Sequence, residues 1–273
     1  MFKIKTFADD PELGFTCVTS ASGGRGVLRM PITVHRATAE GMPDGLDCLI
    51  IAGDLQGYES QAPPVMMREL IGITIARELG QLAEAKVLPD PMRTAVLLSG
   101  DLYAIPTLDK RGGLGDVTPV WREFGERFVE VVGVAGNHDL FGTSATVPTR
   151  MPLQNLYVLD GEVAEVRGLK VGGYCGVLGE SGKAWRRSYG DFSAALDLLR
   201  ELNPDIIITH EPIAPPRGQR PGNIALTPFF KGNGPQPLMV CGHMHWDEPF
   251  LEFDGWQMLN VDARVVIVER ARG

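Results

Sequence analysis

Five short apolar runs constrain the fold of this chain more than any other feature, and each run ends in polar residues. They occupy residues 46–54, 95–101, 131–139, 205–211 and 238–245. Nearly continuous apolar runs rich in β-branched residues are typical of strands that are buried on both faces. Helical patterns lie between them, at 65–86, 118–130 and 190–202. This alternation predicts a layered α/β fold.

Shorter strand patterns follow from residue 156 onward. They lie at 156–159, 162–166, 169–174, 249–253, 256–261 and 264–269. Turn signals separate several of them, namely Asp160-Gly161, Arg167-Gly168 and Asp254-Gly255. Such dipeptides favour tight hairpin turns. We therefore expect these strands to be antiparallel additions to a central sheet.

The length and the turn-rich segments favour one domain over residues 1–273. At about 150 residues per domain, 273 residues allow one domain or two. The Gly/Pro-rich segments are loop-sized, and no linker or internal repeat stands out. Residues 1–45 precede the first apolar run and contain Gly23-Gly24-Arg25-Gly26, which suggests an extra hairpin. His35 lies in this extension and is expected to be an ordinary strand residue.

The charge balance limits the classes of partner. With 26 basic and 34 acidic residues, the net charge of −8 disfavours nucleic acid, although a local groove would escape this argument. We expect no membrane partner, because no run of 18 apolar residues and no signal-like segment is present. The four cysteines lack CxxC spacing and are interpreted as reduced, structural thiols. A cytoplasmic location is expected, and the oligomeric state cannot be inferred.

Potential metal ligands follow all five apolar runs, and four of the five histidines are among them. A single aspartate after a strand is often a helix cap, and a single histidine is often a core residue. Neither explanation accounts for all five strand ends together. Strand ends meet at one edge of an open α/β sheet, so we expect these side chains to converge. They are Asp54 with Gln56, Asp101, Asn137 with His138, His210, and His243 with His245.

The spacing within these motifs indicates two metal ions. Residues i and i+2 at a strand end project to the same side, so Asp54/Gln56 and His243/His245 can each straddle a pair of ions. Two divalent ions against two carboxylates leave positive charge that can hold a phosphate on an acidic protein. Mixed nitrogen and oxygen ligands suit Mn, Fe, Zn or Ni better than calcium.

Taken in order, these motifs resemble the five-block signature of the calcineurin-like metallophosphoesterase superfamily. The blocks are Gly53-Asp54-Leu55-Gln56-Gly57, Gly100-Asp101, Gly136-Asn137-His138-Asp139, Thr209-His210 and Gly242-His243-Met244-His245. The resemblance implies a four-layer αββα sandwich of mixed sheets. It assigns the first ion to Asp54, Gln56, Asp101 and His245, and the second ion to Asp101, Asn137, His210 and His243. It also implies that His138 stabilises the transferred phosphoryl group and protonates the leaving oxygen.

The expected reaction is hydrolysis of a small phosphomonoester or phosphodiester, with nucleotides among the candidates. A metal-bridging hydroxide attacks phosphorus directly, Asp101 bridges the two ions, and His138 is the general acid. Two alternatives remain open. One is a metal-binding scaffold without catalytic activity, and the other is a nuclease of the same superfamily.

Two positions depart from the family pattern. Gln56 replaces the usual histidine of the first block, and a glutamine oxygen is a harder, weaker ligand for transition metals than imidazole. We therefore expect a looser first ion and a preference for Mn²⁺. Ala104 stands where protein phosphatases carry an aspartate that orients the general acid. This argues against a protein phosphatase and leaves His138 without an assigned partner, for which Asp139 is a candidate by adjacency alone.

Candidate substrate contacts are weaker. Tyr103 follows the second strand end, and Arg186 and Arg187 form a basic pair that can contact a phosphate. Segment 109–116 is a candidate flexible lid over the cleft.

Overall fold

The five apolar runs form buried strands, which confirms the prediction. The computed structural model describes residues 1–21, 26–59, 68–110, 113–180, 182–231 and 236–271. The five strands are β4 (Cys48–Gly53), β6 (Thr94–Leu98), β8 (Glu130–Gly133), β15 (Ile206–Thr209) and β16 (Leu238–Cys241). Nearly all of their residues are buried, as expected for strands covered on both faces.

The predicted helices are present, with shorter bounds in two cases. They are α1 (Ile71–Glu84), α2 (Thr118–Gly125) and α3 (Tyr189–Glu201). The predicted first helix began at residue 65, and residues 60–67 lie outside the described ranges. Ser188 caps α3 by accepting a hydrogen bond from the Asp191 amide at 3.1 Å. Short 3₁₀ helices form at η3 (Pro91–Arg93), η4 (Pro216–Gly218) and η5 (Ile224–Phe230).

Within the described residues, the strands form two main sheets rather than one central sheet. The larger sheet has the order β10-β8-β6-β4-β19-β3-β2-β5, with β1 also paired to β3, and the smaller has the order β11-β12-β15-β16-β18-β17. Their further strands are β1 (Lys3–Phe7), β2 (Leu13–Ser20), β3 (Val27–Glu40), β5 (Tyr58–Glu59), β10 (Leu156–Val158), β11 (Glu162–Val166), β12 (Leu169–Tyr174), β17 (Phe250–Phe253), β18 (Trp256–Asn260) and β19 (Arg264–Arg270). Two-strand ladders join β7 (Gly115–Asp116) to β9 (Asp139–Leu140) and β13 (Val177–Leu178) to β14 (Arg186–Arg187).

The expectation of purely antiparallel additions is only partly right. The pairs β11–β12 and β17–β18 are antiparallel hairpins. However, β10, β12 and β18 pair in parallel with β8, β15 and β16. These short strands therefore belong to the two main sheets, where each one pairs with a buried parallel strand.

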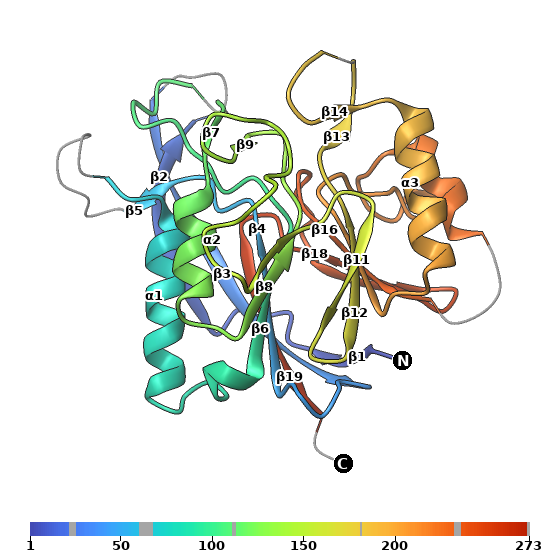
Figure 1. Ribbon diagram of the computed structural model, residues 1–273, viewed down its shortest axis with the longest axis horizontal. Helices are drawn as coiled ribbons and strands as arrows, with labels where there is room; N and C mark the ends of the chain where they lie inside the picture. The colour runs from blue at the N-terminus through green and yellow to red at the C-terminus, as the bar shows by residue number, and fades with distance from the viewer. Residues whose placement is uncertain (22–25, 60–67, 111–112, 181, 232–235, 272–273) are drawn as a thin grey trace.

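The layers form an αββα sandwich, as predicted. Figure 1 shows α1 and α2 over the outer face of the larger sheet and α3 over the outer face of the smaller one. Buried side chains of both sheets form one core between them, and a second core lies under α3. Because the two sheets pack face to face, the carboxyl ends of β4, β6 and β8 meet those of β15 and β16.

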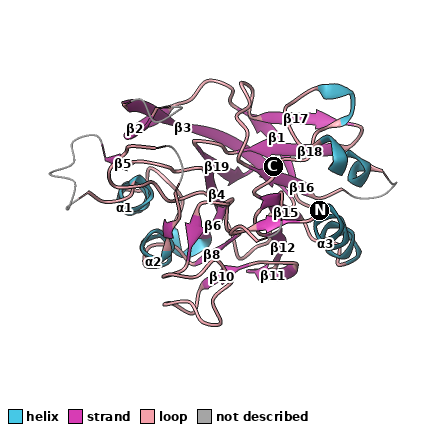
Figure 2. Cartoon of the chain, turned by 90° about the horizontal axis from the view of Figure 1, so that it is seen from above, coloured by secondary structure: helices cyan, strands magenta, loops and turns pink. Residues whose placement is uncertain are grey.

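The N-terminal extension contributes three strands to the larger sheet. Strands β2 and β3 form the antiparallel hairpin that was predicted, although residues 22–25 of its turn lie outside the described ranges. Strand β3 pairs in parallel with β19, which in turn pairs with β4. Seen from above, β2 and β3 lie at the periphery near β5 (Figure 2). His35 is a buried strand residue that contacts the Ala8 carbonyl and stacks on Phe7.

The four cysteines are buried and free, and burial raises the pKa of each thiol. Among the described residues, no helix has the length and apolar character needed to span a bilayer.

Candidate metal centre

Backbone conformation presents the candidate ligands directly at the strand ends. Asp54, Asp101 and His243 follow β4, β6 and β16 closely and have φ values of 49°, 53° and 63°. Residues other than glycine rarely adopt this left-handed backbone conformation, and those that do cluster at functional sites. Each ligand therefore lies at the point where the chain turns sharply away from its strand.

Glycines allow these strand ends to approach one another. A Cβ on Gly136 would lie 2.1 Å from Asp101 Oδ1, and a Cβ on Gly242 would lie 2.2 Å from Asp54 Oδ2. Both distances are far inside van der Waals contact. Gly136 thus allows the ends of β8 and β6 to approach within the larger sheet, and Gly242 allows the end of β16 in the smaller sheet to reach the end of β4 in the larger one.

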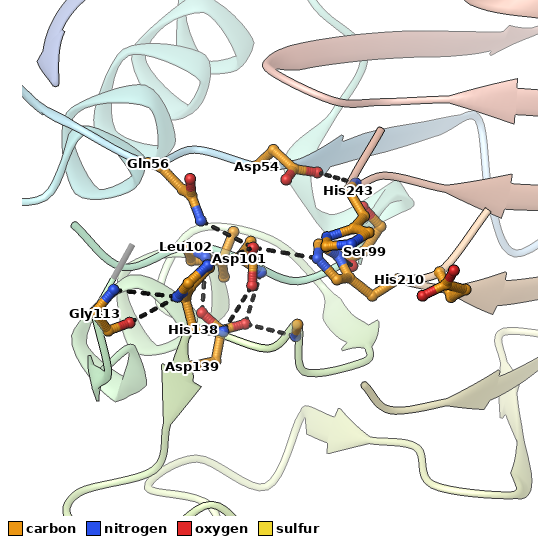
Figure 3. A network of polar contacts seen from close by, with 12 residues as sticks. Asp54, Gln56, Ser99, Asp101, Leu102, Gly113, His138, Asp139, His210 and His243 are labelled. Carbon is orange, nitrogen blue, oxygen red and sulfur yellow. Dashed lines mark hydrogen bonds and ion pairs between the residues drawn. The ribbon is translucent and has the colours of Figure 1, made fainter. Parts of the chain in front are cut away.

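Asp101 is at the centre of the site (Figure 3). Its Oδ1 accepts the His138 amide at 2.9 Å, and its Oδ2 accepts the Gln56 side-chain amide at 2.9 Å. His210 Nε2 lies 3.2 Å from the same Oδ2. Burial alone would raise the pKa of Asp101, but the neighbouring His210 and His138 outweigh it and lower that pKa. The carboxylate is therefore ionised and available to a cation.

Three of the four predicted ligands of the second ion lie close together. The ligand atoms of Asp101, His210 and His243 all lie within 4.8 Å of one another. His210 Nδ1 lies 2.8 Å from the Ser99 carbonyl, which fixes the ring and leaves Nε2 directed at the cluster. The buried Asn137 Oδ1 has no hydrogen-bond partner among the described residues, and His210 Nε2 faces the Asp101 carboxylate at 3.2 Å. An unpartnered buried oxygen is costly, and coordination of a cation would satisfy it.

The electrostatics of this cluster also favour a cation. Burial disfavours the charged imidazolium of His210, yet Asp101 and Asp54 outweigh it and raise its pKa to about 10. Burial, followed by the charge of His210, lowers the pKa of His243 to about 4. The carboxylates thus create a site for positive charge, and His243 is held neutral, as a metal ligand must be.

The remaining ligands of the first ion are already engaged with protein groups. Asp54 Oδ2 accepts the His243 amide at 3.0 Å, and burial and the charge of Asp262 raise the pKa of Asp54. Gln56 directs its amide nitrogen, not its oxygen, toward Asp101. The exposed His245 is held through Nδ1 by Asp262 Oδ2 at 3.0 Å. At the first ion position, the ligands would therefore have to leave or share their present protein contacts when a metal binds.

His138 is oriented by a backbone group and not by Asp139. Its Nδ1 lies 2.9 Å from the Gly113 carbonyl and 3.2 Å from the Gly113 amide, so this one residue holds the ring whether Nδ1 donates or accepts. Its Nε2 then faces the site, 3.9 Å from Asp101 Oδ2. Gly113 belongs to the predicted lid at 109–116, of which residues 111–112 are outside the described ranges. Part of that segment thus supports the candidate general acid.

Asp139 has a different role, because its carboxylate ties together the loops that carry the ligands. It is fully buried and accepts the amides of Asp101 and Gly136 on Oδ2, at 2.8 and 2.9 Å. Its Oδ1 accepts the amide of Leu102 at 2.8 Å. Three backbone groups next to candidate ligands therefore depend on this one side chain.

Asp139→Asn is expected to destabilise the fold by about 1–3 kcal/mol, because an amide NH₂ would face a backbone donor that then lacks an acceptor. The measurement is the free energy of unfolding from urea titration of metal-free protein. Asp10→Asn, at an exposed position, is the matched control. Equal unfolding free energies for the two variants would contradict the role of Asp139.

The candidate substrate contacts are placed unevenly. Tyr103 lies against the loop that holds His138, since a Cβ on Gly115 would be 2.0 Å from its ring. Arg186 is close enough for its charge to contribute to the lowered pKa of His243. Arg187 Nη2 donates to both carboxylate oxygens of Asp160, and the guanidinium lies over the rings of Tyr174 and Trp185. Its predicted contact with substrate stays a prediction without support from these contacts.

Three residues at the site were missed by sequence reasoning. The Gly113 carbonyl orients His138, Asp262 orients His245, and Arg264 Nη2 lies 3.3 Å from His245 Nε2. Asp262 follows β18 just as the other polar residues follow their strands, so the same strand-end criterion could have found it. A backbone carbonyl leaves no comparable signal in the sequence.

Comparison with known proteins assigns most of the chain to a family. Residues 45–247 match the family described as calcineurin-like phosphoesterase. A search of curated proteins finds no match. Among solved structures, the sulfate thiohydrolase SoxB of Thermus thermophilus in complex with glycerol is similar, with 14% identity and a TM-score of 0.42. The alignment covers 81% of this chain and 52% of SoxB, so the chain spans about half the length of that structure.

Proposed function

This chain belongs to the calcineurin-like phosphoesterase family, and within this class of metal-dependent phosphate-ester hydrolases we propose that it cleaves a small phosphomonoester or phosphodiester. Nucleotides are among the candidate substrates. The observation that carries the proposal is the convergence of Asp101, His210 and His243, whose ligand atoms lie within 4.8 Å of one another. Asn137, next in sequence to His138, adds a buried Oδ1 without a hydrogen-bond partner among the described residues. A buried constellation of this kind is built to be completed by a ligand.

The donor set fits divalent transition metals. Asp101, Asn137, His210 and His243 would hold one ion, and Asp54, Gln56 and His245 would join Asp101 around a second. When bound, the ions would supply Lewis acidity, which activates water and neutralises phosphoryl charge. Among the candidate metals we favour Mn, with Fe, Zn and Ni as alternatives, because the ligands mix imidazole with carboxylate and amide oxygens.

His138 and Asp101 would provide the remaining chemistry. With Nδ1–H held by the Gly113 carbonyl at 2.9 Å, protonated His138 presents Nε2–H toward the site. It can donate this proton to the oxygen of the departing alcohol, which would otherwise leave as an unstable alkoxide. Asp101 keeps His138 in place by accepting its backbone amide.

A panel of substrates and metals tests the proposed function. Aryl phosphate monoesters, aryl diesters and cyclic nucleotides would be assayed with Mn²⁺, Zn²⁺, Ni²⁺ and Mg²⁺. Turnover of a monoester or diester supports the proposal and identifies the preferred class. Absence of turnover with every ion would favour the non-catalytic scaffold, and cleavage restricted to nucleic acid would favour the nuclease.

Gln56→His is expected to tighten binding of one ion by about tenfold or more and to shift preference from Mn²⁺ toward Zn²⁺. To act as a ligand, Gln56 must reorient its side-chain amide, since its nitrogen and not its oxygen contacts Asp101. An imidazole needs no such rearrangement. Calorimetric titration of both proteins with Mn²⁺ and Zn²⁺ measures stoichiometry and affinity. Identical stoichiometry, affinity and preference would remove Gln56 from the ligand set.

The single-domain organisation and the cytoplasmic location stay predictions. The first is supported by the site itself, which takes ligands from strand ends of both sheets, so independent halves would each lack part of it.

A further inference from the structure

A pocket adjoins the position of the first ion. Its volume is about 470 Å³, within the range of ligand-binding cavities. Asp54, Gln56 and His245 line its inner side. Gln56 also connects it to the candidate general acid, because the Asp101 oxygen that Gln56 contacts lies 3.9 Å from His138 Nε2. A group bound in this pocket is therefore next to the site where the ester bond would break.

The outer walls come from segments outside the part of the chain that matches the family. One wall is formed by Thr19 of β2 and by Met30, Pro31 and Thr33 of β3. The other is formed by Asp262 and Ala263, which lie between β18 and β19, and by Arg264, the first residue of β19. The Thr33 amide donates to the Ala263 carbonyl at 3.3 Å, which fixes the two walls to each other. Both walls lie beyond residues 45–247, the part of the chain that matches the family.

The charges of the pocket select against a second anionic group. Asp262 carries a carboxylate that contacts His245. The one guanidinium among the described lining residues, Arg264, is buried and occupied: Nη1 donates to Asn260 Oδ1 at 3.2 Å, and Nη2 donates to the Trp246 carbonyl. It is held by protein acceptors, while Met30 and Pro31 offer apolar surface.

We propose that this pocket, which we call the arm pocket (Thr19, Met30, Pro31, Thr33 and residues 262–264), binds the alcohol half of the substrate as a bulky, uncharged organic group. The inference rests on the proposed function, since it assigns the phosphoryl group to the metal centre. It defines the substrate class as phosphoesters of fused-ring or nucleoside-sized alcohols. Inorganic polyphosphate and nucleoside diphosphates would place additional negative charge beside Asp262.

Two esters with leaving groups of similar basicity and different size provide the test. Wild-type protein is expected to hydrolyse 2-naphthyl phosphate with a kcat/KM about tenfold above that for phenyl phosphate, because the second ring gains apolar contact. Met30→Trp fills the pocket and should reduce this ratio about tenfold. Leu28→Trp, on the exposed part of the same strand and outside the pocket, should leave the ratio unchanged.

Met30→Ala is a second variant in case Met30→Trp does not fold, since it removes apolar contact without overpacking. It should raise KM for the naphthyl ester more than for the phenyl ester. If both Met30 variants melt like wild type and keep the wild-type ratio, the arm pocket is refuted. Binding of naphthylphosphonate and phenylphosphonate, measured by calorimetry, separates the two proposals. Suppose the wild-type protein shows no turnover but prefers the naphthyl compound, and Met30→Trp loses this preference. That result would support the arm pocket and contradict the proposed function.

Discussion

His138→Ala is expected to lower kcat by about 100- to 10,000-fold with unchanged metal content, because it removes the proposed proton donor and none of the proposed metal ligands. The ring is already held for this task. Its Nδ1 is fixed by the Gly113 carbonyl at 2.9 Å, and its Nε2 lies 3.9 Å from Asp101 Oδ2. The measurement is kcat with saturating Mn²⁺, together with metal analysis of the purified variant.

The size of this loss should depend on the leaving group. A p-nitrophenolate leaves without protonation, so its ester should lose far less rate than an alkyl phosphate, whose alkoxide needs a proton. Equal losses for both esters would contradict a general-acid role and would indicate that His138 stabilises charge on the phosphoryl group instead. A fall in bound metal would show that the alanine variant disturbs Asp101, whose Oδ1 accepts the His138 amide.

Much of the fold could be predicted because the pattern of burial is local. The runs around β4 and β6 contain almost only apolar residues, and only strands covered on both faces have that composition. The division into two sheets is not local. It depends on long-range pairing: β18 pairs with β16 in the smaller sheet, whereas β19, next along the chain, pairs with β4 and β3 in the larger one. A short strand carries no mark of which neighbours it will have, so strand patterns alone cannot separate one central sheet from two. The two-sheet prediction came from the family resemblance.

The candidate ligands could be predicted because strand ends carry a chemical signal. His210 and His243 belong to different strands of the smaller sheet, yet both contact the region of Asp101, which follows a strand of the larger sheet. Their residue types and positions were sufficient to group them. The orientation of Gln56 was not predictable, because whether an amide presents nitrogen or oxygen depends on the atoms around it.

The arm pocket could not be predicted from the sequence. Met30 and Thr33 lie in an extension whose sequence predicts a hairpin and nothing more. They come to face the metal centre only because β3 pairs with β19, whose first residue is Arg264. Long-range pairing of this kind leaves no local pattern, so a pocket built from the two ends of the chain becomes visible only in the folded structure.

Asp101→Asn is expected to weaken metal binding by more than about 100-fold and to remove activity, the largest effect of any single change. Loss of groups that merely orient ligands costs about 10- to 100-fold in affinity, and Asp101 is the proposed ligand of both ions. The new amide nitrogen would also meet either the Gln56 donor at 2.9 Å or the His138 amide at 2.9 Å, so a favourable contact becomes a repulsive one. Metal stoichiometry and affinity, measured by calorimetry and elemental analysis, give the result without reference to turnover.

Asp254→Asn is the matched control, because it makes the same chemical change in the same backbone region. Asp254 lies in an exposed turn with φ 45°, close to the 53° of Asp101, and asparagine tolerates this left-handed conformation at both positions. Any difference between the variants therefore reflects the surroundings of the carboxylate and not backbone strain. If Asp101→Asn kept full metal content and affinity, the cation would have to be held by His210, His243 and Asn137 alone. Three neutral ligands would then leave its charge uncompensated in a buried site, and burying an unpaired charge is energetically costly.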